Sequence, residues 1–275
     1  MKNFFYIVIL IVLGSCTRQI PFDDPGSEQK LVLSGLIEPN DSIAVEVSAS
    51  ASILRPGDAV LVDDADISLY EDGIYLGDLE PDEFDVYRLD FAPKEGHIYE
   101  LVGSHEDLGA VSSETTIPSA LGVSNITVDD AINVNDEQIF RVAFDLDDPV
   151  GDNFYVLHIV ENNYWGDNWS QSFFSTDPFF LGGSQDNYFW DGAVFRDDAF
   201  DGQKQRITID LDYVGNNGIL LISATEEHFL YHLSYKAYQN SNGDPFAQPV
   251  QIYSNVENGL GIFAGHNKTF TEIPY

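Results

Sequence analysis

Cysteine is almost absent from this 275-residue sequence, and the one cysteine, Cys16, cannot form an intramolecular disulfide. It follows Leu13-Gly14-Ser15, the pattern of a lipobox, in which small residues fit the signal peptidase and the thiol receives a diacylglyceryl group. We therefore expect lipidation at Cys16. An ordinary secretory peptide with a chance cysteine is the alternative.

Basic residues are also scarce: 12 lysines and arginines stand against 46 aspartates and glutamates, for a formal charge of −34. Such a charge repels phosphate backbones and anionic lipid headgroups, which excludes nucleic acid and acidic membrane surfaces as partners. The hydrophobic fraction of 44% is nevertheless sufficient for folded cores.

The amino terminus reads as a targeting segment. Lys2 precedes the apolar run Phe4–Leu13, which is too short to span a bilayer, so residues 1–16 are expected to be a lipoprotein signal peptide. Residues 17–29 contain Pro21, Pro25 and Gly26 and read as a flexible tether. Thr17 rather than aspartate after the cysteine argues against retention in an inner membrane. We expect an outer-membrane lipid anchor, on the periplasmic or the cell-surface face.

The rest of the chain predicts a mainly β protein of two β-sandwich-like domains. In residues 30–118, about seven short strands follow one another at regular spacing, which indicates an immunoglobulin-like sandwich without a disulfide. Asp72-Gly73, between Ala65–Tyr70 and Ile74–Leu79, is typical of a hairpin turn.

Residues 119–275 predict a second β-rich domain. Its clear strands are Ser124–Val128, Gln138–Phe144, Phe154–Glu161, Arg206–Leu211 and Gly218–Ala224. Helical periodicity appears at residues 226–240, where Phe229, Leu230 and Leu233 share one face. A hairpin is expected afterwards, with strands at Pro249–Val256 and Leu260–Ala264 joined by Glu257-Asn258-Gly259. Gly259 and Gly261 are expected at positions where a Cβ would be opposed.

An aromatic excursion at residues 162–202 separates two of these strands and contains all three tryptophans. Aromatic faces beside short polar side chains are typical of sugar and peptide sites. The candidate ligand- or partner-binding residues are Tyr164, Trp165, Trp169, Tyr188 and Trp190. The alternative is that the aromatic residues only pin a long loop to the sandwich.

Two acidic turns and a histidine pair are the candidate metal ligands. Asp145, Asp147, Asp148 and Asp152 form one turn, and Asp197, Asp198 and Asp201 the other. Of these, Asp145, Asp147 and Asp152 are the weak calcium candidates, although neither turn has the spacing of a calcium-binding loop. His228 and His232 are four residues apart, a spacing used for zinc, but with no evident third ligand they are expected to be surface or groove-lining residues. No cofactor is expected.

Catalytic signatures are missing: the sequence contains no Gly-x-Ser-x-Gly elbow, phosphate loop or dinucleotide fingerprint. A binding or accessory protein is therefore the first hypothesis. A hydrolase acting on glycans or peptides is the second, and a deep pocket with convergent polar groups would favour it.

The carboxy-terminal region carries a family resemblance. Asn242-Gly243-Asp244-Pro245-Phe246, Tyr253-Ser254-Asn255-Val256 and the run from Glu257 to Gly265 resemble the signature of a Bacteroidetes lipoprotein family known as domain of unknown function 4249. The resemblance implies an outer-membrane lipoprotein found beside TonB-dependent receptors, so an outer-membrane transporter or another envelope protein is the expected partner. It brings no catalytic residues.

The lipobox generates the first prediction. Replacing Cys16→Ala removes the acceptor thiol, so the protein should be released from membranes or accumulate as an unprocessed precursor. Membrane fractionation with lipid labelling measures this. Unchanged membrane association and normal labelling of the variant would contradict lipidation at Cys16.

Overall fold

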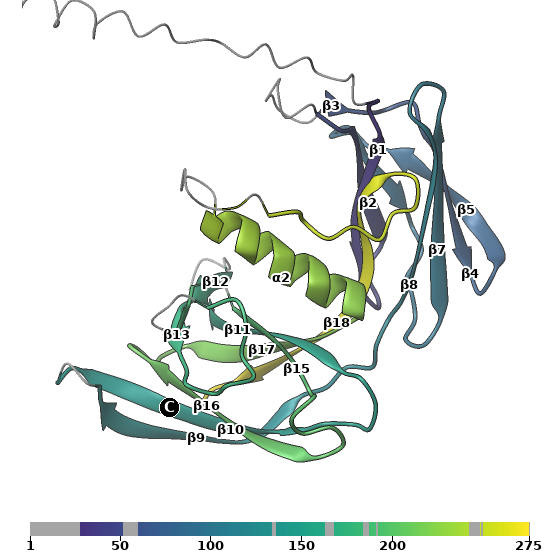
Figure 1. Ribbon diagram of the computed structural model, residues 1–275. Coiled ribbons are helices and arrows are strands. Elements are labelled where there is room, and N and C mark those ends of the chain that lie inside the picture. Colours follow the sequence, from purple (N-terminus) through teal and green to yellow (C-terminus); the bar gives the residue numbers. More distant parts are fainter. Residues whose placement is uncertain are drawn as a thin grey trace, which may run out of the picture.

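The computed structural model describes residues 28–51, 60–133, 136–162, 168–183, 187–190, 192–241, 248 and 250–274; at 162, 168 and 169 only the backbone is described. The fold is mainly β, as the sequence predicts, with two sheets and one helix in the described residues (Figure 1). Neither sheet closes on itself there. No helix among the described residues has the length and apolarity needed to cross a membrane.

The first half of the chain packs two layers of strands around one core. One layer has the order β1-β2-β6, and β5 leads from it into the other, β5-β4-β7-β8. The hairpin predicted at Asp72-Gly73 is confirmed, because both residues have positive φ between β4 and β5. The strands are β1 Leu31–Ile37, β2 Ile43–Ala49, β3 Val60–Leu61, β4 Asp66–Glu71, β5 Ile74–Pro81, β6 Val86–Leu89, β7 Ile98–His105 and β8 Gly109–Thr116.

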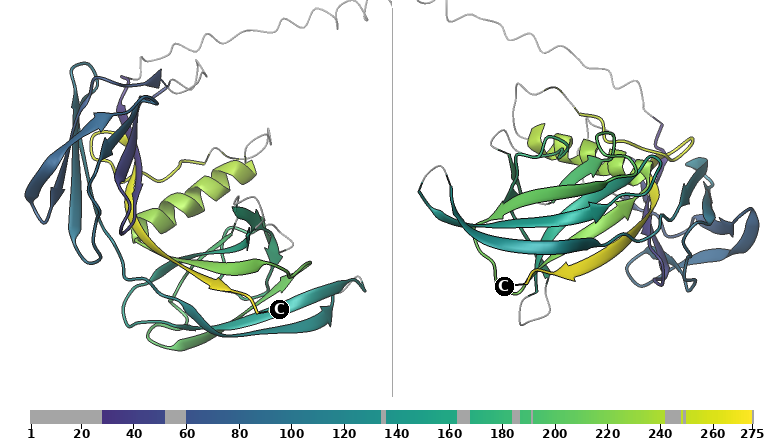
Figure 2. Two further views of the ribbon diagram at one scale, coloured as in Figure 1. Left: turned by 180° about the vertical axis from the view of Figure 1, so that it is seen from behind. Right: turned by 90° about the horizontal axis from the view of Figure 1, so that it is seen from below.

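The second half also has two layers, seen in Figure 2. The five-stranded sheet β14-β13-β16-β10-β9 packs its apolar face against β11, β17 and the short strands beside them. The strands are β9 Val123–Ile132, β10 Gln138–Asp147, β11 Phe154–Asn162, β12 Asn168–Gln171, β13 Phe173–Phe174, β14 Tyr188–Phe189, β15 Ala193–Arg196, β16 Lys204–Leu211, β17 Asn217–Ala224 and β18 Leu260–Glu272.

The only described helix, α2 (Glu226–Ser241), begins and ends within one residue of the predicted range. It lies across the outer face of β11, β15 and β17, in the angle between the two halves (Figure 1). Phe229 is its buried anchor and packs with Val156, Val194 and Ala224. A lone amphipathic helix must cover apolar surface in this way, because it cannot bury its face alone.

Strand β18 joins the two halves. Val32 to Ile37 of β1 pair with Leu260 to Gly265 in parallel, and the remainder of β18 pairs antiparallel with β17. The predicted hairpin is wrong: residues 250–256 form no strand, and the partner of the 260–265 segment is β1. Ile262 to Gly265 are buried on both faces because chain packs on each side of them, which explains the continuous apolar run.

The segment before β18 closes the open side of the first half. Glu257 exchanges two backbone hydrogen bonds with Ser112 of β8, and the Asn255 side chain both donates to and accepts from the backbone of Phe263. Val256 and Phe263 enter the core of the first half. That core is therefore completed by residues from the far end of the sequence.

Glycines at this junction have the role that the sequence predicts. A Cβ at Gly259 would lie 2.7 Å from the Leu31 carbonyl oxygen, and one at Gly261, where φ is 110°, would collide with the Leu33 carbonyl oxygen. A Cβ at Gly265 would collide with the carbonyl oxygen of Thr116, at a φ that other residues adopt. Backbone thus approaches backbone on both sides of β18.

Three alanine substitutions separate the two penalties. Gly96→Ala meets only the positive φ of 77°, with open space around the Cβ, and should cost about 1 kcal/mol. Gly265→Ala meets only the collision and should lower the free energy of unfolding by about 1–3 kcal/mol. Gly261→Ala meets both penalties and should lower the free energy of unfolding by about 3 kcal/mol or more, which corresponds to roughly 6–12 °C in melting temperature. Thermal melts measure the order; a Gly261→Ala variant as stable as Gly96→Ala would contradict the close packing of β18.

Candidate functional site

The aromatic excursion is part of the fold and also forms an exposed surface. Strands β12 and β15 pair with β11, whereas β13 and β14 extend the five-stranded sheet. Its phenylalanines enter the core of the second half: Phe173, Phe180, Phe189, Phe195 and Phe200 are buried. For these five phenylalanines, the alternative that aromatic residues pin the long loop to the sandwich is confirmed.

The opposite face of β13 and β14 carries three aromatic rings that point outward. Phe174 packs edge-on against Tyr188, with ring centroids 5.6 Å apart, and Tyr188 stacks on Trp190 at 6.0 Å and 26°. Trp190 is 71% exposed. Side chains alternate between the faces of a strand, so the neighbours Phe173 and Phe189 are buried while this trio is outside. We call Phe174, Tyr188 and Trp190 the aromatic platform.

The structure brings two of the five predicted binding residues together. Tyr188 and Trp190 lie in the aromatic platform. Tyr164 and Trp165 lie outside the described residues, and the side chain of Trp169, on β12, is not described. Phe174 was not among the predicted residues, although its position next to a core phenylalanine in a short strand is the signal that places it outside.

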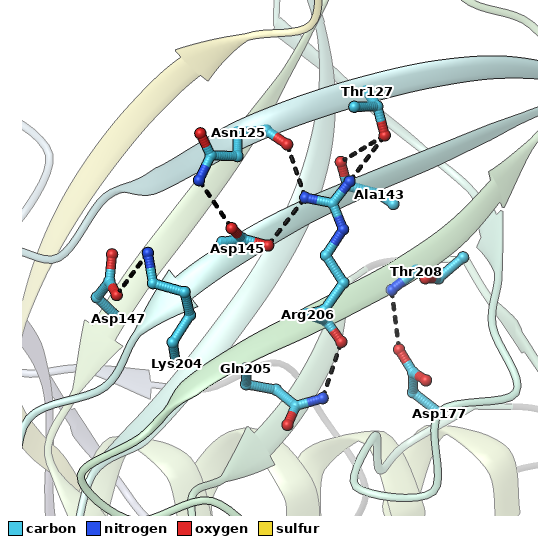
Figure 3. A network of polar contacts seen from close by, with 10 residues as sticks. All are labelled: Asn125, Thr127, Ala143, Asp145, Asp147, Asp177, Lys204, Gln205, Arg206 and Thr208. Carbon is cyan, nitrogen blue, oxygen red and sulfur yellow. Dashed lines mark hydrogen bonds and ion pairs between the residues drawn. The ribbon is translucent and has the colours of Figure 1, made fainter.

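Two of the four aspartates in the first acidic turn form ion pairs with basic residues of β16 (Figure 3). Arg206 of β16 donates from Nη1 to Asp145 at 2.8 Å and to the Asn125 carbonyl at 2.7 Å, and Lys204 Nζ lies 2.9 Å from Asp147. Asn125 and Arg206 hold the pKa of Asp145 below its ordinary value by hydrogen bonding. Asp152, the third calcium candidate, is exposed.

A different set of aspartates joins the two acidic turns. Oxygen atoms of Asp148, Asp197 and Asp201 lie within 4.8 Å of one another, and these are the described carboxylates best arranged to hold a hard cation. Asp148 and Asp197 are buried. Each carboxylate also accepts from the other turn: Asp148 from Gly202 N–H, Asp201 from Gly151 N–H, and Asp197 from Asn153 N–H. The set therefore holds the turn after β10 to the turn after β15, and we call Asp148, Asp197 and Asp201 the aspartate clamp.

The electrostatics of this clamp follow from burial. Burial raises the pKa of Asp148, with the charges of Asp197 and Asp201 adding to the effect, while hydrogen bonds from Tyr155 and Gly202 oppose it. Burial and the bond to Asp148 also raise the pKa of the Tyr155 hydroxyl, which donates to that carboxylate. Tyr155 therefore stays protonated and acts as a donor.

Histidines gather beneath α2, and His228 is a buried member of this group instead of the expected surface or groove-lining residue. His228 is buried with 5% exposure, and its ring centroid lies 5.2 Å from that of His266 on β18. His232 lies 6.4 Å from His228 and 6.2 Å from His158 on β11. Four of the six histidines in the sequence thus form one row, which we call the histidine row. Sequence spacing showed only the helical pair, because the other two come from distant strands.

The aspartate clamp predicts a pH dependence of stability. An aspartate whose folded pKa is raised contributes most to stability below its ordinary pKa, near 3.8, and loses that contribution as pH rises through the folded value. The stability of the parent relative to Asp148→Asn should therefore increase as the pH falls from 7 towards 4. Denaturant unfolding of both proteins at several pH values measures the difference between their free energies of unfolding. Taking this difference cancels the general effect of the acidic surface, which both proteins share. A difference that shrinks on acidification would contradict the shift.

Comparison with known proteins identifies the chain by family. No curated protein matches it, and no solved structure matches it. One family profile does, over residues 17–272, which is nearly the whole chain. The chain belongs to the family described as Domain of unknown function (DUF4249).

Proposed function

We propose that the protein is a lipid-anchored binding or accessory protein of the outer membrane that works with a TonB-dependent transporter. The observation that carries this proposal is the aromatic platform. Tryptophan and tyrosine are enriched in protein recognition surfaces, where a rigid ring supplies much contact area at little entropic cost. A tryptophan that is 71% exposed has no role in the core.

The anchor is proposed at Cys16, on the strength of the lipobox, with residues 17–29 as the tether. Residue 28 leads directly into β1, so the tether enters the folded part at the first half, while the aromatic platform belongs to the second. The proposed anchor lies in the outer membrane, on either its periplasmic or its cell-surface face. The charge of −34 keeps the folded part away from anionic lipid headgroups.

The finer fold assignment supports a scaffold role. We propose that the first half is an immunoglobulin-like sandwich, because its layers β1-β2-β6 and β5-β4-β7-β8 have the strand order of that fold without its disulfide. The second half is proposed as a second sandwich-like unit that bears α2. Rigid sandwiches commonly position recognition surfaces of this kind.

A hydrolase is the second candidate, and one observation favours it. Asp148 is a buried carboxyl whose pKa is raised beside a second buried carboxylate, Asp197, which is an arrangement found in acid–base catalysis. Both carboxylates, however, accept backbone hydrogen bonds from the facing turn. The clamp accounts for them without a reaction, so the binding function is preferred.

Trp190→Ala tests the proposal against Phe84→Ala, which removes an equally exposed ring (70%) from the first half. The parent should co-purify an outer-membrane transporter from solubilised outer membranes. Trp190→Ala should weaken that complex by about 2 kcal/mol, roughly thirtyfold, with an unchanged melting temperature. Phe84→Ala should bind like the parent.

Two outcomes contradict the proposal. Trp190→Ala could bind as tightly as the parent, which would remove the platform from the interface. It could instead lose about 3–5 kcal/mol of stability, as a core tryptophan does. Turnover of a glycan or peptide substrate that Asp148→Asn abolishes would favour the hydrolase.

A further inference from the structure

The histidine row contains two buried ring nitrogens with no hydrogen-bond partner among the described residues, Nδ1 of His228 and Nδ1 of His266. Buried polar atoms are nearly always partnered, and each exception requires an explanation. These two belong to neighbouring imidazoles that come from different elements, the helix and β18. Nitrogen atoms of neutral imidazoles are the commonest protein ligands of transition metals.

The separation of the His228 and His266 rings fits shared coordination. A zinc–nitrogen bond of about 2.0–2.1 Å places each ring centroid roughly 3 Å from the ion, so two histidines on one ion have centroids about 5 Å apart at the tetrahedral angle and at most about 6 Å apart. His228 and His266 are 5.2 Å apart, whereas His228 and His232 are 6.4 Å apart, so the His232 ring must move closer to share the ion. His228 and His232 also have the helical spacing of four residues that zinc sites use.

We propose that His228, His232 and His266 bind one transition-metal ion of the zinc class between α2 and β18. Among the described residues, three ligand atoms already lie within 4.8 Å of one another only in the aspartate clamp, so the imidazoles must rotate to converge. His232 and His266 are half-buried and give the ion access from solvent. The ring of His158 lies 6.2 Å from that of His232, edge-on.

The surroundings of His266 are those of a metal ligand. Its Nε2 lies 3.5 Å from the Glu38 carboxylate, which Lys268 also holds at 2.6 Å. A carboxylate on one ring nitrogen fixes the ring and leaves the other nitrogen for the ion, as in carboxylate–histidine–zinc arrangements. The unpartnered Nδ1 is that other nitrogen.

Burial favours the neutral form of two of the three rings. Burial, with the neighbouring histidines adding to it, lowers the pKa of His228 to about 3, and burial also lowers the pKa of His266. Both rings are therefore neutral and able to coordinate. A bound ion would join the helix to β18 through three side chains.

Cobalt(II) tests the site, because a tetrahedral Co²⁺ complex absorbs in the visible region. The full chain, freed of metal with a chelator, is titrated with Co²⁺ in excess Mg²⁺, which occupies carboxylate sites. We expect one equivalent to produce visible bands and to raise the melting temperature. His232→Asn and His266→Asn should each weaken Co²⁺ binding by more than the roughly 10- to 100-fold expected for Glu38→Gln.

His97→Asn is the matched control, since His97 also lies beside carboxylates but is not part of the histidine row. It should bind Co²⁺ like the parent, and metal-free melts establish that every variant is folded. Absence of visible bands in the parent would overturn the proposal. So would bands that persist with unchanged affinity in both His232→Asn and His266→Asn.

Discussion

The backbone pairing of β18 is the constraint on which the rest of the structure depends. One strand supplies hydrogen bonds to β1 in the first half and to β17 in the second, while Glu257 pairs with β8. Such close approach on several sides leaves no space for side chains at Gly261 and Gly265. Gly259, Gly261 and Gly265 of the family signature thus have a packing explanation, and no ligand needs to be invoked for them.

The same principle of side-chain alternation produces both the core and the exposed surface of the second half. In β13 and β14, one residue enters the core and the next faces solvent, so Phe173 and Phe189 are buried while Phe174 and Tyr188 point outward. A shift of one residue in register would exchange the two sets. The position of the aromatic platform is therefore fixed by the burial of the phenylalanines behind it.

Much of this architecture could be predicted from local sequence. Period-two strands, the Asp72-Gly73 turn and the helix near residues 226–240 all depend on neighbouring residues, and their predicted ranges agree with the structure to within a few positions. The partner of β18 could not be predicted, because Val32 and Leu260 are distant in the sequence and Pro249–Val256 offered a nearer apolar segment. For the same reason the sequence does not relate His158 and His266 to the helical pair, or Asp148 to Asp197, because each set comes together only in the folded chain.

The parallel arrangement of β1 and β18 has a mechanical consequence. Residue 28 leads towards the beginning of β1, whereas β18 continues from its far end into the second half. A pull on the start of β1 against a partner held by the second half would therefore slide the two strands along each other. Their six register pairs, from Val32–Leu260 to Ile37–Gly265, share that load instead of opening one after another. Under the proposed function, the fold is thus arranged to withstand traction between the proposed lipid anchor and the aromatic platform.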